Sequence, residues 1–128
     1  MKYLLDTHLL LWAAGDSPKL SADARAIIEN EDNELYFSAG SIWEIAIKTA
    51  LGKPEFQVSA SLFRRLLLDN GYQELPIDSR HAALTETLPD IHKDPFDRIL
   101  IAQSQTEGIT LMSADEKVIA YGHTVLGV

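Results

Sequence analysis

Several acidic side chains in this sequence lie within or directly after apolar runs, where a charged carboxylate is unusual. Asp6 directly follows the apolar run 3–5 and precedes a second apolar run, 9–12, so folding should carry its carboxylate to the edge of the core. A charge in such a position is costly unless it is paired, hydrogen-bonded or bound to a metal. Asp6 therefore predicts that other groups converge on it.

Glu44 lies among large apolar residues in the run 42–47, which predicts a helix that is buried nearly all round. A glutamate inside such a helix needs a partner. Two interpretations stay open: a functional carboxylate, or a capping box formed by Ser41 and Glu44 if the helix begins at Ser41 rather than Ser38. Lys48 follows Glu44 by one helical turn, so an ordinary ion pair is its simplest interpretation.

Asp94 and Asp97 are three residues apart at an expected helix start, so their side chains face the same way. Asp94 precedes Pro95 and fits an N-cap well, which is the alternative to a role as a ligand. Asp97 has less local reason to be an acid, although acids in a first helical turn also complement the helix dipole.

Asp115 comes just after the apolar run 109–112, with the Ser113 hydroxyl beside it, and its alternative is again a helix start. Hard cations such as Mg²⁺ prefer oxygen ligands, and several carboxylates cannot all stay ionised at close range without a cation. A cation would relieve the repulsion, activate a water molecule and stabilise charge on a transferring phosphoryl group. Together the acids predict a divalent-metal site that acts on a phosphate ester.

Other residue types give weaker signals. The four histidines have no metal-ligand spacing, although His92, close to Asp94, could contact a substrate. Arg98 could contact phosphate or pair with an acid. Trp12 and Trp43 are expected in the core. The chain has no glycine-rich phosphate loop and no Gly-x-Ser-x-Gly motif.

Composition limits the function classes. A chain of 128 residues suits one domain, 1–128, and 46% hydrophobic with 23% charged residues is typical of a globular protein. A net charge of −8 disfavours simple electrostatic binding to a nucleic-acid backbone, unless some acids hold a cation. The absence of cysteine excludes disulfides, thiolate metal sites and a cysteine nucleophile. No apolar run approaches the roughly 18 residues of a membrane span, and we expect a cytoplasmic protein.

The elements that must position the acids alternate between strands and helices. Strands are expected at 2–5, 34–37, 73–75, 109–112 and 124–126. Helices are expected at 7–14, 21–31, 38–51, from Ser59 or Ser61 to Gly71, 78–88, 95–107 and 114–121, with a mobile loop at 89–94. This order predicts an α/β fold: three α/β/α layers around a short, mostly parallel sheet, with a site outside the carboxyl ends of the strands.

Five motifs occur in order along the chain: Leu-Leu-Asp-Thr-His, Ser-Ile-Trp-Glu-Ile-Ala-Ile-Lys, Leu-Gly-Lys, His-Lys-Asp-Pro-Phe-Asp-Arg-Ile-Leu-Ile-Ala-Gln and Leu-Met-Ser-Ala-Asp. Together they resemble the PIN domain family, in particular the VapC-type toxins of bacterial toxin–antitoxin pairs, over essentially the whole chain. The resemblance implies a PIN-like fold and a metal-dependent endoribonuclease with one or two Mg²⁺ or Mn²⁺ ions. It also implies a homodimer and a cognate antitoxin that blocks the site.

The resemblance also implies roles for individual residues. The family's four acids match these positions, the expected catalytic and metal-binding residues: Asp6, Glu44, Asp97 and Asp115. Expected auxiliary residues are Asp94, Ser113 and Thr7, and expected substrate contacts are Arg98, Lys48 and His92. Two other interpretations stay open: a metal-dependent DNA nuclease or phosphatase, and a non-catalytic signalling or interaction module with an acidic pocket.

Overall fold

The computed structural model describes all residues from Met1 to Val128 and contains one five-stranded sheet. The strands are β1 (Lys2–Leu5), β2 (Glu34–Ser38), β3 (Gln73–Leu75), β4 (Thr110–Ser113) and β5 (Val125–Gly127). They lie in the order β3-β2-β1-β4-β5, and every neighbouring pair is parallel. The expected strands are confirmed to within one residue at each end.

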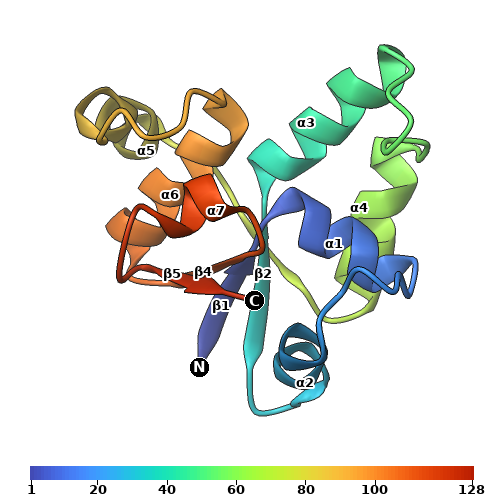
Figure 1. Cartoon of the computed structure of the whole chain (residues 1–128). Helices are drawn as coiled ribbons and strands as arrows, with labels where there is room; N and C mark the ends of the chain where they lie inside the picture. The colour runs from blue at the N-terminus through green and yellow to red at the C-terminus, as the bar shows by residue number, and fades with distance from the viewer.

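Helices cover both faces of this sheet, so the expected three-layer arrangement is confirmed (Figure 1). One face is covered by α1 (Thr7–Ala14), α2 (Ala22–Glu29) and α4 (Ala60–Asp69). The other is covered by α5 (Ser79–Leu84), α6 (Pro95–Glu107) and α7 (Glu116–Ile119). The remaining helix, α3 (Ala39–Ala50), continues directly from β2.

The central strand shows why the two layers form. Side chains of a strand alternate between the faces of a sheet. Leu5 therefore packs with Leu9 of α1 in one buried cluster, whereas Leu4 packs with Leu100 and Ile101 of α6 in the other. The register of β1 pairs Leu4 with residues in the middle of both neighbouring strands. Burial on both faces explains the continuous apolar run that ends at Asp6.

The strand order reverses beside β1, and this creates the place for a site. The chain passes from β1 to β2 and β3 on one side, then crosses to β4 and β5 on the other. In open parallel sheets a crevice forms outside the carboxyl ends of the strands at such a reversal. Asp6 follows β1 and Ser113 ends β4, so both lie at this crevice.

Helix starts decide two alternatives that the sequence left open. The Ser38 hydroxyl accepts a hydrogen bond from the Gly40 N–H and caps α3, so a capping box between Ser41 and Glu44 is wrong. Ser59, not Ser61, caps α4.

Two expected helices are shorter than predicted. Residues 78–88 contain α5 and then a 3₁₀ turn, η1 (Thr85–Thr87), in which both threonine hydroxyls donate to carbonyl oxygens three residues earlier. The helix expected at 114–121 is limited to α7, because Asp115 is its N-cap.

Two further expectations differ from the structure. Trp43 is not in the core, because 62% of its surface is exposed on α3, whereas Trp12 does pack against the core. The segment 89–94 is not a free loop: the Tyr121 hydroxyl donates to the Pro89 carbonyl at 2.8 Å and accepts from the His92 N–H at 3.0 Å. No helix is long and apolar enough to cross a membrane.

Candidate active site

Asp6 is buried at the carboxyl end of β1, and both of its carboxylate oxygens are used. Oδ1 accepts from the Leu9 N–H at 2.9 Å, which makes Asp6 the N-cap of α1. Oδ2 accepts from the Ser113 hydroxyl at 2.5 Å. Burial raises the pKa of Asp6, although both hydrogen bonds act in the opposite direction. The two hydrogen bonds fix the orientation of the carboxylate, and its buried environment disfavours its negative charge.

Glu44 is also buried, with 2% of its surface exposed, on the helix that leaves β2. Its Oε2 accepts from Lys48 Nζ at 2.5 Å, so the expected i,i+4 ion pair is present. Its Oε1 is buried and has no hydrogen-bond partner. A buried carboxylate oxygen without a partner is costly, and a cation or a bound water molecule would satisfy it.

Asp97 and Asp94 begin α6, and His92 lies against them. Asp94 Oδ1 accepts from the Phe96 and Asp97 N–H groups at 2.8 and 3.3 Å, so its N-cap interpretation is confirmed. His92 Nε2 lies 2.7 Å from Asp97 Oδ2. One ligand-type atom from each of His92, Asp94 and Asp97 lies within 4.8 Å of the others. Capping uses one oxygen of Asp94 and leaves its second oxygen available.

The pKa of Asp97 reports how closely the acids converge. Burial is the largest cause that raises this pKa, to about 6, and the charge of Asp94 is the next. The charges of Asp6 and Glu44 raise it further, while the contact with His92 lowers it. Four carboxylates from three parts of the chain therefore meet at one crevice.

Asp115 stands at the rim of this cluster. It is exposed and caps α7, with Oδ1 accepting from the Lys117 N–H at 2.8 Å, so the helix-start interpretation is confirmed. Its own N–H donates to the Ser113 hydroxyl oxygen, which in turn contacts Asp6. The charge of Asp115 is the smallest of the causes that act on the pKa of Asp6.

Arg98 is held by several hydrogen bonds to the segment that precedes α6. Its guanidinium donates to the carbonyls of Thr85 at 2.6 Å and of Pro89 and His92 at 3.1 Å, and to the Tyr121 hydroxyl at 3.0 Å. These bonds tie the segment 85–92 to α6. The expected substrate contact of Arg98 stays a prediction, and its hydrogen bonds also make it an anchor for the loop that carries His92.

Sequence reasoning missed the polar contacts that fix the helices around the acids. The Thr7 hydroxyl donates to Ser41 Oγ at 2.9 Å and joins α1 to α3. The Ser38 hydroxyl donates to Gln103 Oε1 at 2.6 Å and joins the start of α3 to α6. A glutamine inside the apolar part of the motif Ile-Leu-Ile-Ala-Gln was the available signal, since a buried amide needs partners.

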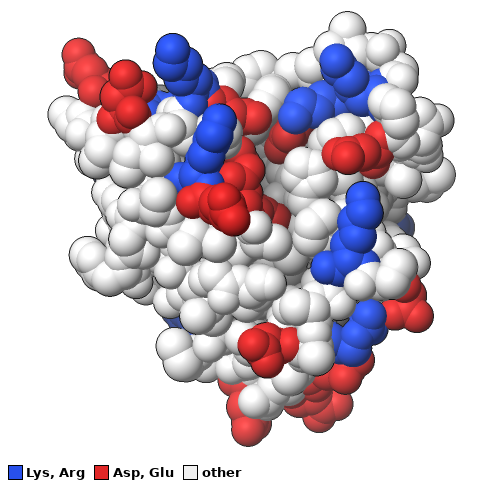
Figure 2. All heavy atoms as spheres, viewed as in Figure 1, with Lys and Arg blue, Asp and Glu red and all other residues white.

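The donor set fits a hard divalent cation. Carboxylate oxygens dominate the crevice, thiolates are absent, and Glu44 supplies a buried oxygen with no partner. In Figure 2, acidic side chains gather over α7 and in the hollow between α6 and α3, and basic side chains stand on both sides of it. The catalytic and metal-binding roles of Asp6, Glu44, Asp97 and Asp115 stay predictions.

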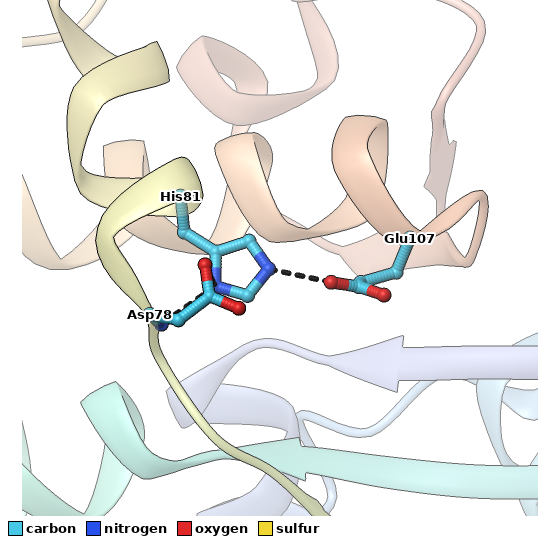
Figure 3. A group of neighbouring side chains, drawn as sticks. All are labelled: Asp78, His81 and Glu107. Carbon is cyan, nitrogen blue, oxygen red and sulfur yellow. Dashed lines mark hydrogen bonds and ion pairs between the residues drawn. The ribbon is translucent and has the colours of Figure 1, made fainter.

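A second group of ligand-type residues, Asp78, His81 and Glu107, lies where α5 packs on α6 (Figure 3). His81 Nδ1 accepts from the Asp78 N–H at 3.0 Å, which leaves the ring proton on Nε2, 2.7 Å from Glu107 Oε2. Both ring nitrogens are thus used within the protein. This group caps α5 and docks it on α6 rather than offering a metal site.

Comparisons with known proteins agree with this geometry. The family model of the PIN domain matches residues 3–123. Ribonuclease VapC16 of Mycobacterium tuberculosis is 41% identical over 71 residues, which are 52% of this chain and 50% of that protein. The match thus spans only about half the length of that relative.

Solved structures share the fold. VapBC2 from Rickettsia felis, solved bound to a promoter DNA fragment, aligns with a TM-score of 0.69 at 14% identity, over 100% of this chain and 98% of that one. VapC20 of Mycobacterium tuberculosis, described as a toxin that cleaves the sarcin-ricin loop, aligns with a TM-score of 0.67 at 12% identity, over 94% and 95% of the chains. With a family match from residue 3 to residue 123, this chain belongs to the PIN domain family.

Proposed function

We propose that this chain is a metal-dependent endoribonuclease and the toxin of a toxin–antitoxin pair. The observation that carries the proposal is the convergence of Asp6, Glu44, Asp94 and Asp97 in one crevice, where the Glu44 Oε1 atom is buried without a partner. Neighbouring carboxylates raise one another's pKa, and a bound cation would relieve this repulsion. The likeness to Ribonuclease VapC16 over half of its length supports RNA as the substrate.

The residues that would hold Mg²⁺ or Mn²⁺ are Asp6, Glu44, Asp97 and Asp115, with Asp94 as an auxiliary acid. One or two ions would supply an activated water and stabilise charge on the phosphate as the phosphodiester bond breaks. The site's own contacts set the orientation of these ligands, since Ser113 holds Asp6 and His92 holds Asp97. Such outer contacts fix the position of a ligand and its basicity.

Lys48 and His92 are the proposed substrate contacts. Lys48 Nζ lies beside Glu44 and 5.7 Å from the centre of the Phe96 ring, so its positive charge stands at the edge of the acidic crevice. A phosphate group entering the crevice would gain from that charge. The His92 side chain is 13% exposed and contacts Asp97. It could donate a hydrogen bond to a phosphate oxygen if it released Asp97.

The proposal extends to protein partners. Structural neighbours include VapBC complexes and a toxin–antitoxin complex from Klebsiella pneumoniae, which supports an antitoxin as the partner that blocks the crevice. The net charge of −8 suits a basic segment in that partner. We also propose a homodimer.

Purified protein should cleave single-stranded RNA when Mg²⁺ or Mn²⁺ is added and should lose this activity in EDTA. Asp6→Asn should lower the rate at least about a hundredfold, since losing even an outer contact of a metal ligand costs 10–100-fold. The matched control is Asp78→Asn, an exposed acid outside the crevice whose replacement still caps a helix. Gel analysis of end-labelled RNA measures the cleavage rates of wild type, Asp6→Asn and Asp78→Asn.

Undiminished cleavage by a folded Asp6→Asn protein, or cleavage that ignores the chelator, would overturn the proposal. Faster hydrolysis of DNA or of a phosphomonoester in the same panel would redirect it to a DNA nuclease or a phosphatase. Regulated expression in bacteria tests whether the protein is a toxin. Wild type should arrest growth, and Asp6→Asn should not.

A further inference from the structure

Trp43 is the most unusual exposed side chain beside the crevice. It lies on α3 with 62% of its surface exposed, and its ring meets Phe96 of α6 edge-on, with centroids 5.4 Å apart and planes at 75°. A tryptophan gains much from burial, so an indole left on the surface next to an active site points to a ligand or partner. Trp43 is not among the buried residues of either core cluster.

A pocket of about 470 Å³ lies beside this aromatic pair. Its walls include Trp43, Phe96 and Ile77, together with two basic side chains, Lys93 and Arg98. Its volume falls within the range of about 300–1,000 Å³ that small-molecule pockets occupy. The pocket thus combines aromatic and aliphatic walls with basic side chains.

The pocket is joined to the acids through the chain itself. Trp43 directly precedes Glu44 on α3, and Phe96 directly precedes Asp97 on α6. The close approach of the two helices depends on Gly40, where a Cβ atom would lie 3.2 Å from both Ile77 Cδ1 and Ile99 Cγ2. The same two helices thus present carboxylates to the crevice and aromatic rings to the pocket next to it.

We propose that this pocket receives an unpaired nucleobase adjacent to the scissile phosphate, and that the base stacks on Trp43. The inference rests on the proposed function, because it takes RNA as the substrate. Single-stranded nucleic acids are bound by aromatic rings that stack with bases and by cations that meet the backbone. Trp43 supplies the ring, Lys93 lines the same pocket, and Lys48 lies over the neighbouring Phe96 ring. A base in a duplex is already stacked, so the pocket selects single-stranded RNA.

Cleavage kinetics on a single-stranded RNA of mixed sequence test the stack. Trp43→Ala should raise KM about tenfold or more, the loss expected for one base–aromatic stack, and leave kcat nearly unchanged. Trp43→Tyr should keep most of the affinity, because a tyrosine ring still stacks. The matched control is Leu62→Ala, which removes another exposed apolar side chain, on helix α4, that does not line the pocket. Equal KM values for Trp43→Ala and Leu62→Ala would overturn the proposal.

Binding separates this inference from the proposed function. Trp12 and Trp43 are the only tryptophans, so in an Asp6→Asn, Trp12→Phe protein the emission comes from Trp43 alone. Mixed-sequence RNA should quench this emission, and an abasic oligomer of equal length should not. Quenching by RNA without any cleavage by wild type would defeat the nuclease and keep the base pocket. Cleavage without quenching would defeat the base pocket and keep the nuclease.

A second copy of this chain is the rival occupant, and sedimentation tests it. Wild type and Trp43→Ala should sediment with the same mass, since the pocket serves the substrate. A change of mass in Trp43→Ala, with no change in KM, would assign Trp43 to an interface between copies and overturn the proposal.

Discussion

At the scale of single residues, the most informative group is the Asp97 carboxyl. Burial and the charge of Asp94, followed by the charges of Asp6 and Glu44, raise its pKa to about 6. The pKa of an unfolded aspartate is about 3.9. The folded protein therefore binds a proton that the unfolded chain releases, and the stability from Asp97 is present below about pH 4 and lost as pH rises through 6.

This titration predicts a pH dependence of stability in the metal-free protein. Between pH 5 and pH 7 the free energy of unfolding should fall by about 1 kcal/mol more in wild type than in Asp97→Asn, which has no proton to lose there. Urea unfolding of both proteins at the two pH values, in EDTA, measures the difference. An identical pH dependence in the two proteins would show that the fold does not raise the pKa of Asp97.

The same residues show how far sequence reasoning reaches. Asp6 and Glu44 could be chosen because each is an acid within apolar sequence, and the structure buries both. The anchoring role of Arg98 was not predicted, because its partners include backbone carbonyls that the sequence does not mark. Trp43 was misjudged because hydrophobicity alone does not distinguish a core tryptophan from an exposed one.

At the scale of elements, the segment between η1 and α6 decides where His92 and Asp94 lie. The Arg98 guanidinium and the Tyr121 hydroxyl together bind its backbone carbonyls. Backbone groups that lose such partners are left unsatisfied at a cost of about 1–3 kcal/mol each. The start of α6 is thus rigid because an arginine within the helix holds the preceding loop.

Arg98→Met, which keeps an unbranched apolar stem and removes the donors, should loosen this segment. We expect a loss of about 2 kcal/mol or more in the free energy of unfolding and faster hydrogen exchange in residues 85–94. The control is Arg65→Met, since Arg65 is exposed on α4. Denaturant titration measures the stability, and hydrogen-exchange mass spectrometry measures the exchange. Equal stability and equal exchange in the two variants would contradict the anchoring role of Arg98.

The bounds of some helices could be predicted from the sequence, whereas those of others and the order of the strands could not. The bounds of α6 follow from Asp94-Pro95 at its start and Gly108, in a left-handed conformation, at its end. The helix expected at 78–88 instead becomes α5 and a 3₁₀ turn, because threonine hydroxyls bond the backbone there. The order of the strands also lay outside any local pattern, because it depends on the crossover between β3 and β4.

At the scale of the whole molecule, the fold brings together acids that are far apart in sequence. The reversal of strand order beside β1 opens the crevice, and α3 and α6 bring Glu44 and Asp97 to it. The acids of the site contribute to the net charge of −8. Clustered carboxylates repel a phosphate group unless a bound cation offsets their charge. A cation bound there should link the acids and stabilise the fold.

Direct titration of Mn²⁺, followed by the electron paramagnetic resonance of the free ion, tests this cation site without any substrate. Wild type and the control Asp78→Asn should bind one or two ions with equal affinity. The double variant Asp6→Asn, Asp97→Asn should bind at least about tenfold more weakly, because two oxygen ligands are lost. Equal binding of Mn²⁺ by wild type and the folded double variant would contradict a metal site at the crevice.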